Sequence, residues 1–259
     1  MIATQAFVRE SAAVAQIELL KLVRDPTELI SRAVQPVLWL VIFGQVLAQV
    51  HGIYAGETGY LAFLTPGILA QSVLFSAIFY GIAVIWERDL GVVHKLLVSP
   101  ARRMSLVFGK AVSAGFRGIV QAAVIYVVAL LLGVGVRHDV AATAGVLAGV
   151  LLGSALFSTF SLIIACIVKT RERFMGIGQL LTMPMFFASN AIYPLDIMPA
   201  WLRAISQANP LTYLVDALRG SMIPGGESVH GYAVDAAILC AVFGGLLMVA
   251  VKLYPTLAE

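Results

Sequence analysis

The chain has 259 residues, of which 60% are hydrophobic and 12% are charged, and its mean hydropathy is +0.94. A soluble domain of this length carries about 25% charged residues, so the composition excludes that class. The formal net charge is only +3 and gives no indication of nucleic-acid binding. The two cysteines and four histidines are scattered, so the sequence predicts neither a disulfide framework nor a metal site.

Six apolar segments are long enough to cross a bilayer, which takes about 20 residues each. Fourteen of the 17 Lys and Arg residues fall on the side that holds both termini, so the positive-inside rule places both termini in the cytoplasm. We therefore expect an all-α polytopic membrane protein with one transmembrane domain over residues 1–259. The predicted spans lie at about 33–50, 60–86, 105–136, 141–168, 174–192 and 232–254.

Two further helices are predicted on the cytoplasmic side. Residues 8–25 form an amphipathic helix on the membrane surface, either as a simple anchor or as a docking element. Residues 87–99 form a shorter helix, in which Leu90, Val93 and Leu97 recur at helical spacing on an apolar side. The polar residues of the opposite side are Glu87, Arg88, His94 and Lys95.

The third span begins with three cations on one face, because Arg103, Lys110 and Arg117 are spaced by seven residues. A charge in the middle of a bilayer costs about 3 kcal/mol or more. We therefore expect the helix to begin below the membrane, with Arg117 reaching up or down to the lipid headgroups. The alternative is a buried, functional arginine.

Glycines recur every four residues on the fourth span, at Gly145, Gly149 and Gly153. This spacing favours close helix approach, either within the chain or at a subunit interface. No Asp or Glu lies in the middle of a predicted span, which argues against a proton- or sodium-coupled carrier. No catalytic motif is present, so we expect no enzyme activity.

Aromatic and sulfur-containing side chains in the second and fifth spans are candidates for a substrate path. Soft, adaptable side chains suit varied apolar ligands. The alternative for each residue is ordinary core packing or contact with lipid. The candidates are Phe79, Tyr80, Met183, Phe186, Phe187 and Asn190.

The outer segment, residues 195–222, is predicted to form two half-helices that dip in between the fifth and sixth spans. The first begins at Pro199 and is broken by Asn209-Pro210. The second runs from Leu211 to about Arg219, where Gly220 ends it. Asp216 and Arg219 are three residues apart and are expected to pair, while Trp201 and Tyr213 are expected to anchor at the interface.

The chain resembles ABC-2 type permeases of the daunorubicin/doxorubicin-resistance branch of bacterial ABC exporters, over nearly its whole length. The residues that carry the resemblance are Glu87-Arg88 with LLVSPARR (96–103), NPLTYLVDALRG (209–220) and MPAWL (198–202). It implies a half-transporter of the bacterial cytoplasmic (inner) membrane that binds no cofactor itself. The chain has no GxxxxGK[ST] loop, so ATP and Mg would sit on a separate ABC ATPase subunit.

The resemblance also implies partners and roles. A second permease copy or a sibling would complete the transporter, surrounded by membrane lipids, and the cargo would be a small hydrophobic substrate. The cytoplasmic helix would dock on the ATPase, with coupling residues Glu87, Arg88, Leu90, His94, Lys95 and Arg103. The half-helices would form an outer gate with Pro199, Trp201, Asn209, Pro210, Tyr213, Asp216 and Arg219. Family members often carry a GTLE-like segment where this chain has DLGVVHKL, so its docking contacts would differ.

Two other functions stay open. One is an ABC-2 permease that exports lipid-linked polysaccharide, which 13 Phe against 8 Tyr and 3 Trp weakly disfavour, because sugar stacking favours the latter two. The other is a proton-coupled secondary carrier, which would follow an ion gradient instead of ATP hydrolysis.

Overall fold

Helices account for most of the described chain, as expected where a membrane forces each backbone to satisfy its own hydrogen bonds. The computed structural model describes residues 2–24, 27–49, 59–168 and 170–258. Positions 25 and 50, at the ends of two predicted segments, lie outside the described residues. The α-helices are α1 (Ile2–Arg24), α2 (Thr27–Leu38), α3 (Gly44–Ala48), α4 (Gly59–Asp89), α5 (Val92–Val98), α6 (Arg103–Leu131), α7 (Val140–Ile167), α8 (Arg171–Phe187), α9 (Ala200–Ala208), α10 (Pro210–Met222) and α11 (Tyr232–Leu253).

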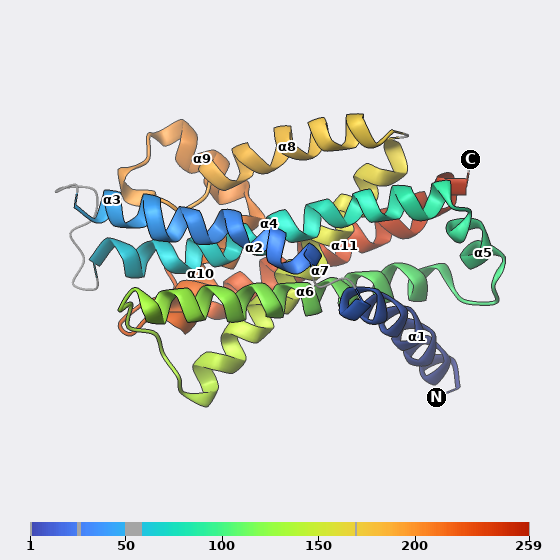
Figure 1. Cartoon of the computed structure of the whole chain (residues 1–259), viewed down its shortest axis with the longest axis horizontal. Coiled ribbons are helices and arrows are strands. Elements are labelled where there is room, and N and C mark those ends of the chain that lie inside the picture. Colours follow the sequence, from blue (N-terminus) through green and yellow to red (C-terminus); the bar gives the residue numbers. More distant parts are fainter. Residues whose placement is uncertain (1, 25–26, 50–58, 169, 259) are drawn as a thin grey trace.

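The long helices run side by side, and the segments that the sequence placed in the cytoplasm gather at one end. In Figure 1, α1, α5, the beginning of α8 and the end of α11 all lie toward the same end of the bundle. A π-helical turn, Trp39–Phe43, joins α2 to α3, and 3-10 turns occupy Leu195–Ile197 and Tyr254–Ala258. The arrangement agrees with the predicted all-α, polytopic class.

Five segments of the described chain are long and apolar enough to cross a membrane, where the sequence predicted six. The missing one is the fifth predicted span, 174–192, which forms α8 and has only 17 residues. At 1.5 Å per residue α8 is about 26 Å long. Pro184 removes one backbone donor near its end, and the helix stops three residues later. The five segments are Ile30–Ala48, Gly59–Asp89, Arg103–Leu131, Val140–Ile167 and Tyr232–Leu257.

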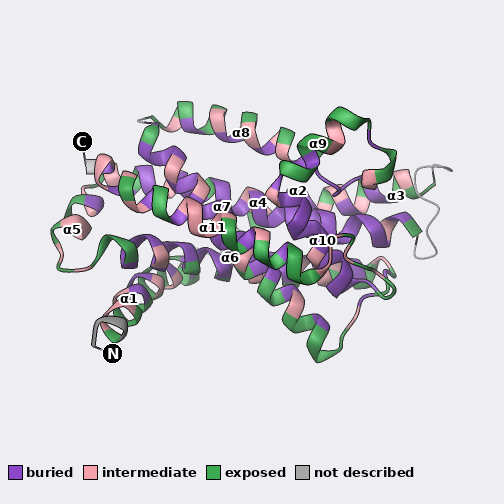
Figure 2. Cartoon of the chain, turned by 180° about the vertical axis from the view of Figure 1, so that it is seen from behind, coloured by how far each residue is buried: buried purple, intermediate pink, exposed green. Residues whose placement is uncertain are grey.

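The core is built on α4 and α7. Their apolar windows are 78% and 72% buried, against 17% for the first span and 22% for the last, a contrast that Figure 2 shows. α7 contacts α4, α6, α10 and α11. Gly149 and Gly153 of α7 face Leu218 and Leu214 of α10, so the glycine repeat serves packing within the chain. The exposed apolar sides of the first and last spans are left for lipid or another subunit.

The predicted cytoplasmic helix 87–99 is divided in the structure. α4 continues without a break through Glu87 and Arg88 to Asp89, and α5 spans only Val92–Val98. Gly91 lies between them with φ of +71°, a left-handed conformation that glycine adopts without steric cost. Glu87 and Arg88 therefore belong to the end of a membrane helix and not to α5.

The outer half-helices are confirmed as two short helices broken at Asn209, whose side-chain oxygen accepts a hydrogen bond from the Leu211 amide at 3.0 Å. α10 is longer than predicted, because it passes Gly220 and ends at Met222. A Cβ on Gly220 would lie 2.5 Å from the Tyr232 hydroxyl. This glycine therefore serves a close helix contact and does not end the helix.

The predicted pair between Asp216 and Arg219 is wrong, because the two side chains have other partners. Arg219 donates to the carbonyl of Asn190 at 2.7 Å, and its guanidinium lies 4.0 Å from the centre of the Phe63 ring. Asp216 instead accepts a hydrogen bond from the backbone of His230 at 3.0 Å. Both residues are buried, so tertiary contacts override the short-range helical pairing.

Candidate functional site

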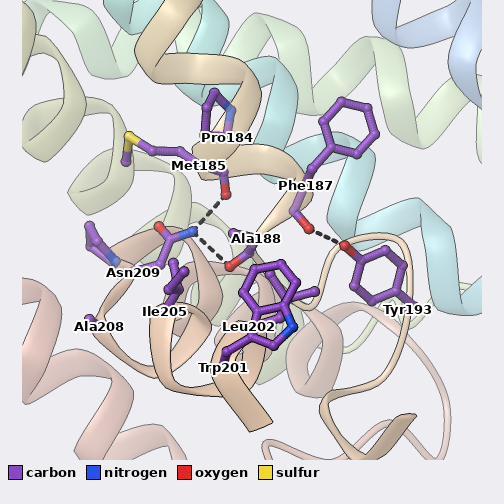
Figure 3. Close-up of a pocket in the computed structure, with 11 residues that line it drawn as sticks. Pro184, Met185, Phe187, Ala188, Tyr193, Trp201, Leu202, Ile205, Ala208 and Asn209 are labelled. Atoms are coloured by element: carbon purple, nitrogen blue, oxygen red, sulfur yellow. Dashed lines mark hydrogen bonds between the residues drawn. The ribbon is translucent and has the colours of Figure 1, made fainter. Parts of the chain in front are cut away.

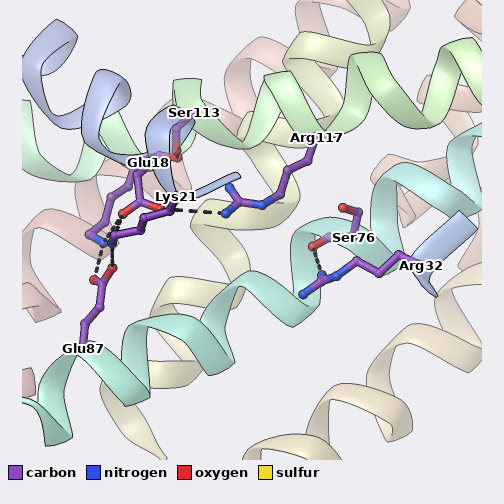
Figure 4. A network of polar contacts seen from close by, with 8 residues as sticks. Glu18, Lys21, Arg32, Ser76, Glu87, Ser113 and Arg117 are labelled. Carbon is purple, nitrogen blue, oxygen red and sulfur yellow. Dashed lines mark hydrogen bonds and ion pairs between the residues drawn. The ribbon is translucent and has the colours of Figure 1, made fainter. Parts of the chain in front are cut away.

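Five charged side chains meet where α1, α4 and α6 come together, and we call this group the ion cluster (Figure 4). The Lys110 ammonium of α6 lies 2.6 Å from Glu87 of α4 and 3.4 Å from Glu18 of α1. The cluster therefore links three helices that are distant in the sequence. Its members are Glu18, Lys21, Glu87, Lys110 and Arg117.

The remaining pairs complete a network around the two carboxylates. Lys21 lies 2.5 Å from Glu87 and 3.0 Å from Glu18, at the edge of the cluster where its side chain is partly exposed. Arg117 lies 3.9 Å from the second oxygen of Glu18. Each carboxylate therefore contacts more than one cation. With three cations and two anions, the group carries a formal charge of +1.

The sequence places these side chains through helical spacing. Lys110 and Arg117 are two turns apart on α6, and both side chains reach Glu18. On α1, the buried stripe runs through Ser11, Val14, Glu18 and Leu22 at intervals of three or four residues. α1 packs this stripe on α6.

The exposed side of α1 carries several large apolar residues. Val8 and Val23 are 59% and 70% exposed. Ile17 and Leu20 are also at least half exposed. The stripe that contains Glu18 thus faces the protein, and large apolar side chains on the other side of α1 face outward, as suits a helix that lies against lipid.

Burial makes the ion cluster energetically demanding. Lys110 and Glu18 are almost inaccessible to water, and a buried ion loses several kcal/mol of hydration. The Tyr80 ring lies 5.6 Å from the Lys110 ammonium and 5.1 Å from the Arg117 guanidinium, positions that allow cation–π attraction. Removing one partner of such a buried pair typically costs about 3–5 kcal/mol. A shift of α1, α4 or α6 that separates these pairs is therefore strongly unfavourable, which fixes the three helices relative to one another.

The acidity of Glu18 reports on this environment. Burial raises the pKa of this carboxyl, but the nearby charges of Lys110, Lys21 and Arg117 outweigh it and lower the pKa from 4.5 to about 2. The surrounding cations therefore keep Glu18 ionised at any physiological pH.

Three sequence-based placements are corrected by the ion cluster. Glu87 was expected on the outer face of a cytoplasmic helix, but it is buried. Arg117 was expected to reach the headgroups, but it turns inward to Glu18. Tyr80 was expected on a substrate path, but it is buried beside the two cations of α6. The sequence did contain a signal for the cluster. Lys110 and Arg117 lie on one face of a predicted span and need counter-ions, and Glu18 and Glu87 are acidic residues near the same end of their helices.

The surface of α5 is mixed in character. Val93 is buried and Leu97 half-buried, as predicted, while His94 and Lys95 are exposed. Leu90 was expected to brace the helix, but it is 70% exposed, and Val98 is 88% exposed. The outward surface of α5, together with the preceding Leu90, thus offers His94 and Lys95 between two apolar side chains.

A second set of contacts ties the end of α4 to the beginning of α8. Asp89 accepts from Arg88 at 2.9 Å and from Arg171 at 2.7 Å. The Arg171 guanidinium also lies 3.5 Å from the centre of the Trp86 ring. Arg88 is therefore engaged locally, whereas Arg103, the last predicted coupling residue, is exposed at the beginning of α6.

Three cavities lie beside α4, α8 or both. The first, of 490 Å³, lies over the ion cluster and is also lined by Trp86 and Leu90. The second, of 190 Å³, lies between α4 and α8 and is lined by Met183. Phe79 lines both, so they are neighbours. The third, of 610 Å³, lies at the far end of α8 and is lined by Phe187.

The third cavity is apolar, and hydrogen bonds to backbone oxygens at the end of α8 join the segments that surround it (Figure 3). Asn209 donates to the carbonyls of Met185 and Ala188, at 2.6 and 3.2 Å. The Tyr193 hydroxyl donates to the carbonyl of Phe187. The break between α9 and α10 is therefore fixed to the end of α8.

The predicted path and gate residues are only partly brought together. Phe79, Met183 and Phe187 line cavities, but Phe186 and Asn190 are buried. Asn190 instead lines a separate space of 230 Å³ beside Arg219. Of the predicted gate residues, Trp201, Asn209 and Pro210 line the third cavity. Pro199 caps α9, and Tyr213 is buried and donates to the carbonyl of Gln207 at 2.6 Å.

The lowered pKa of Glu18 predicts a specific loss of stability in acid. A carboxyl whose pKa falls on folding stabilises the native state above its unfolded pKa, and this contribution is lost as the pH falls from 4.5 towards 2. We expect Glu18→Gln to unfold more easily than wild type at pH 6 and to lose less stability between pH 6 and pH 3. Thermal unfolding in detergent measures both.

The exposed Glu172 of α8 provides the matched control. Glu172→Gln should follow the wild-type pH profile. A Glu18→Gln profile parallel to that of wild type would show that Glu18 is not held ionised by its neighbours.

Comparison with known proteins agrees with a membrane transport subunit. A family model described as ABC-2 type transporter matches residues 10–223. The chain is 31% identical over 215 residues to a Cyanophora paradoxa protein named as transport permease ycf38, covering 82% of this chain and 74% of that one. It is 25% identical to the daunorubicin resistance ABC transporter permease protein DrrB1 of Streptomyces coeruleorubidus, over 86% and 77% of the two chains.

A further relative is nodulation protein J of Rhizobium leguminosarum bv. viciae, 25% identical over 79% of this chain and 78% of that one. The resemblance inferred from the sequence motifs is thereby confirmed. The chain belongs to the ABC-2 type transporter family, as a membrane permease subunit without a catalytic domain.

Proposed function

We propose that the chain is the permease half of an ABC exporter that moves a hydrophobic or amphipathic compound out of the cytoplasm or inner leaflet. ATP hydrolysis on a separate subunit drives the transport, and a second permease completes the pathway. The observation that carries the proposal is that the exposed helix α5 directly follows the end of α4 that the ion cluster fixes to α1 and α6.

The same proposal assigns the orientation. The end of the bundle that holds α1, α5 and the beginning of α8 faces the cytoplasm, in a bacterial inner membrane. Most of the Lys and Arg residues belong to this end, as the positive-inside rule requires.

Helix α5 is the docking element for the ATPase. Its outward surface combines His94 and Lys95 with the apolar Val98, and the exposed Leu90 lies just before it. A complementary partner has an apolar cleft with acidic groups at its edge, because apolar contacts supply affinity and opposite charges supply orientation.

The ion cluster transmits movement of the docking element. Glu87 lies one helical turn before Gly91, at which the chain turns into α5. A displacement of α5 therefore acts on the end of α4, and the contacts of Glu87 with Lys21 and Lys110 carry α1 and α6 along. Closure of the ATPase would move these three helices as one body against α11.

The three cavities supply the substrate path. The cytoplasmic cavity joins charged residues of the ion cluster to the apolar side chains of Phe79 and Trp86. This combination suits a compound with a charged group and an apolar body. The next two cavities are lined mainly by apolar side chains, so the compound would proceed along α8 to Trp201 and the α9–α10 break.

Charge reversal on α5 tests the docking role. We expect His94→Glu together with Lys95→Glu to weaken binding of the cognate ATPase at least tenfold, because an exposed positive charge and its neighbouring imidazole are both replaced by negative charges that repel an acidic partner surface. Binding is measured between the purified permease and its ABC ATPase subunit, and ATP-driven transport is measured in vesicles that contain both. The permease alone should hydrolyse no ATP.

The control is His138→Glu, since His138 is exposed in the segment between α6 and α7, which lies toward the end of the bundle opposite to α5 (Figure 1). This variant should bind and transport like wild type. Unchanged ATPase binding by the α5 variant would remove α5 as the docking element.

Truncation of Phe79 tests the substrate path. Phe79→Ala should lower the initial rate of ATP-driven daunorubicin uptake into inside-out vesicles several-fold, because Phe79 borders two of the cavities. Binding of the ATPase should be unaffected. Phe116→Ala is the matched control, because Phe116 of α6 is exposed to a similar extent, 37% against 39%. Equal rates for the two variants would contradict the path.

A further inference from the structure

A group of two carboxylates and a histidine lies at the other end of the bundle, where α10 approaches the beginning of α11. It consists of Asp216 of α10, Asp235 of the first turn of α11, and His230 of the connecting segment. The His230 Nδ1 atom lies 3.0 Å from Asp216 Oδ2 and 4.0 Å from Asp235 Oδ1. Residues separated by up to 19 positions in the chain thus converge on one point.

Both carboxylates of this group are fully buried, and each is only half satisfied. Asp216 uses Oδ2 for its hydrogen bonds, and Asp235 uses Oδ2 to accept from Ser228 at 2.7 Å. The Oδ1 atom of each has no hydrogen-bond partner within the described part of the chain. Asp235 Oδ1 points toward His230, as the 4.0 Å separation shows.

The charge balance of this group is unfavourable without a further cation. Two buried carboxylates face one histidine, and an unpaired buried charge is expensive. Arg219, on the same helix as Asp216, is directed to the Asn190 carbonyl and the Phe63 ring instead.

We propose that Asp216, His230 and Asp235 bind a divalent transition-metal ion, such as Zn²⁺. One ligand atom from each residue lies within 4.8 Å of the others. In a tetrahedral zinc site the ligand atoms lie about 2.1 Å from the metal and hence about 3.4 Å apart. The observed 3.0 and 4.0 Å bracket that spacing, so small side-chain rotations form the site. The metal takes the place of the proton between His230 and Asp216.

The ligand types indicate the class of metal. Imidazole nitrogen with two carboxylates suits Zn²⁺ and its first-row neighbours, whereas Mg²⁺ and Ca²⁺ prefer sites made of oxygen alone. The His230 side chain is 23% exposed while both carboxylates are inaccessible. An ion therefore enters past His230, and water takes the fourth position.

A bound metal would fasten the segment between α10 and α11 to the buried helix α10. Because α10 packs on α4, α7 and α11, the site would stabilise the end of the bundle opposite to α5. The proposal does not depend on the transport function, and metal binding can be measured on the permease alone.

The test uses the full-length, tag-free permease in detergent after treatment with a chelator. Zn²⁺ should bind with a stoichiometry of one per chain in equilibrium dialysis and raise the midpoint of thermal unfolding, because a ligand of the native state stabilises it. Mg²⁺ at the same concentration should do neither. Co²⁺ should give visible absorption bands of a four-coordinate ion.

His230→Ala removes one ligand at a partly exposed position and should therefore fold. It should lower Zn²⁺ affinity at least tenfold and abolish the stabilisation. Asp235→Asn should act in the same direction. His138→Ala, which removes an exposed histidine near the same end of the bundle, should bind zinc like wild type. Absence of zinc binding by wild type, or equal binding by His230→Ala, would overturn the proposal.

Discussion

The buried contact between Lys110 of α6 and the two glutamates of α1 and α4 constrains the rest of the structure most strongly. Separating these groups inside a membrane protein leaves charges with neither water nor a counter-ion, which is far costlier than losing an apolar contact. The helices must therefore keep one relative position at this end. The position of α5 follows, since only three residues, from Arg88 through Leu90, and the Gly91 turn separate Glu87 from α5.

The remainder of the bundle separates into a well-packed centre and an open side. α4, α7 and α10 are buried, and glycines on α7 allow α10 to approach closely. The first and last spans and α8 keep much apolar surface exposed, and two of the three cavities lie beside α8. A rigid centre next to a loosely packed side is what a transporter requires, because one part must move while another serves as its support.

Features that depend on local sequence could be predicted. Hydropathy located the long spans to within a few residues, and Asn209-Pro210 marked the break between α9 and α10, because a proline restricts the residue before it. The exposed His94 and Lys95 and the buried Val93 followed from helical periodicity. The length of α8 was overestimated, since an apolar run after Pro184 reads as helix although the chain turns there.

Features that depend on tertiary pairing could not be predicted. Taken alone, Glu87 reads as a helix end in water, and only the approach of α1 and α6 makes its burial favourable. Arg117 was expected at the headgroups because its partner, Glu18, lies 99 residues earlier. Asp216 likewise turned from a neighbour on its own helix to His230. In each case one distant counterpart decided the direction of the side chain.

A double-mutant cycle on Glu87 and Lys110 measures the interaction on which this structure depends. The free energies of unfolding of wild type, Glu87→Gln, Lys110→Met and the double variant are compared in detergent at neutral pH. If the pair joins α4 to α6, each single change destabilises the protein, and the double variant is more stable than the sum of the two losses by about 1–3 kcal/mol. Additive losses, equal within about 0.5 kcal/mol, would show that the two residues do not interact and that α4 is not fixed in this way.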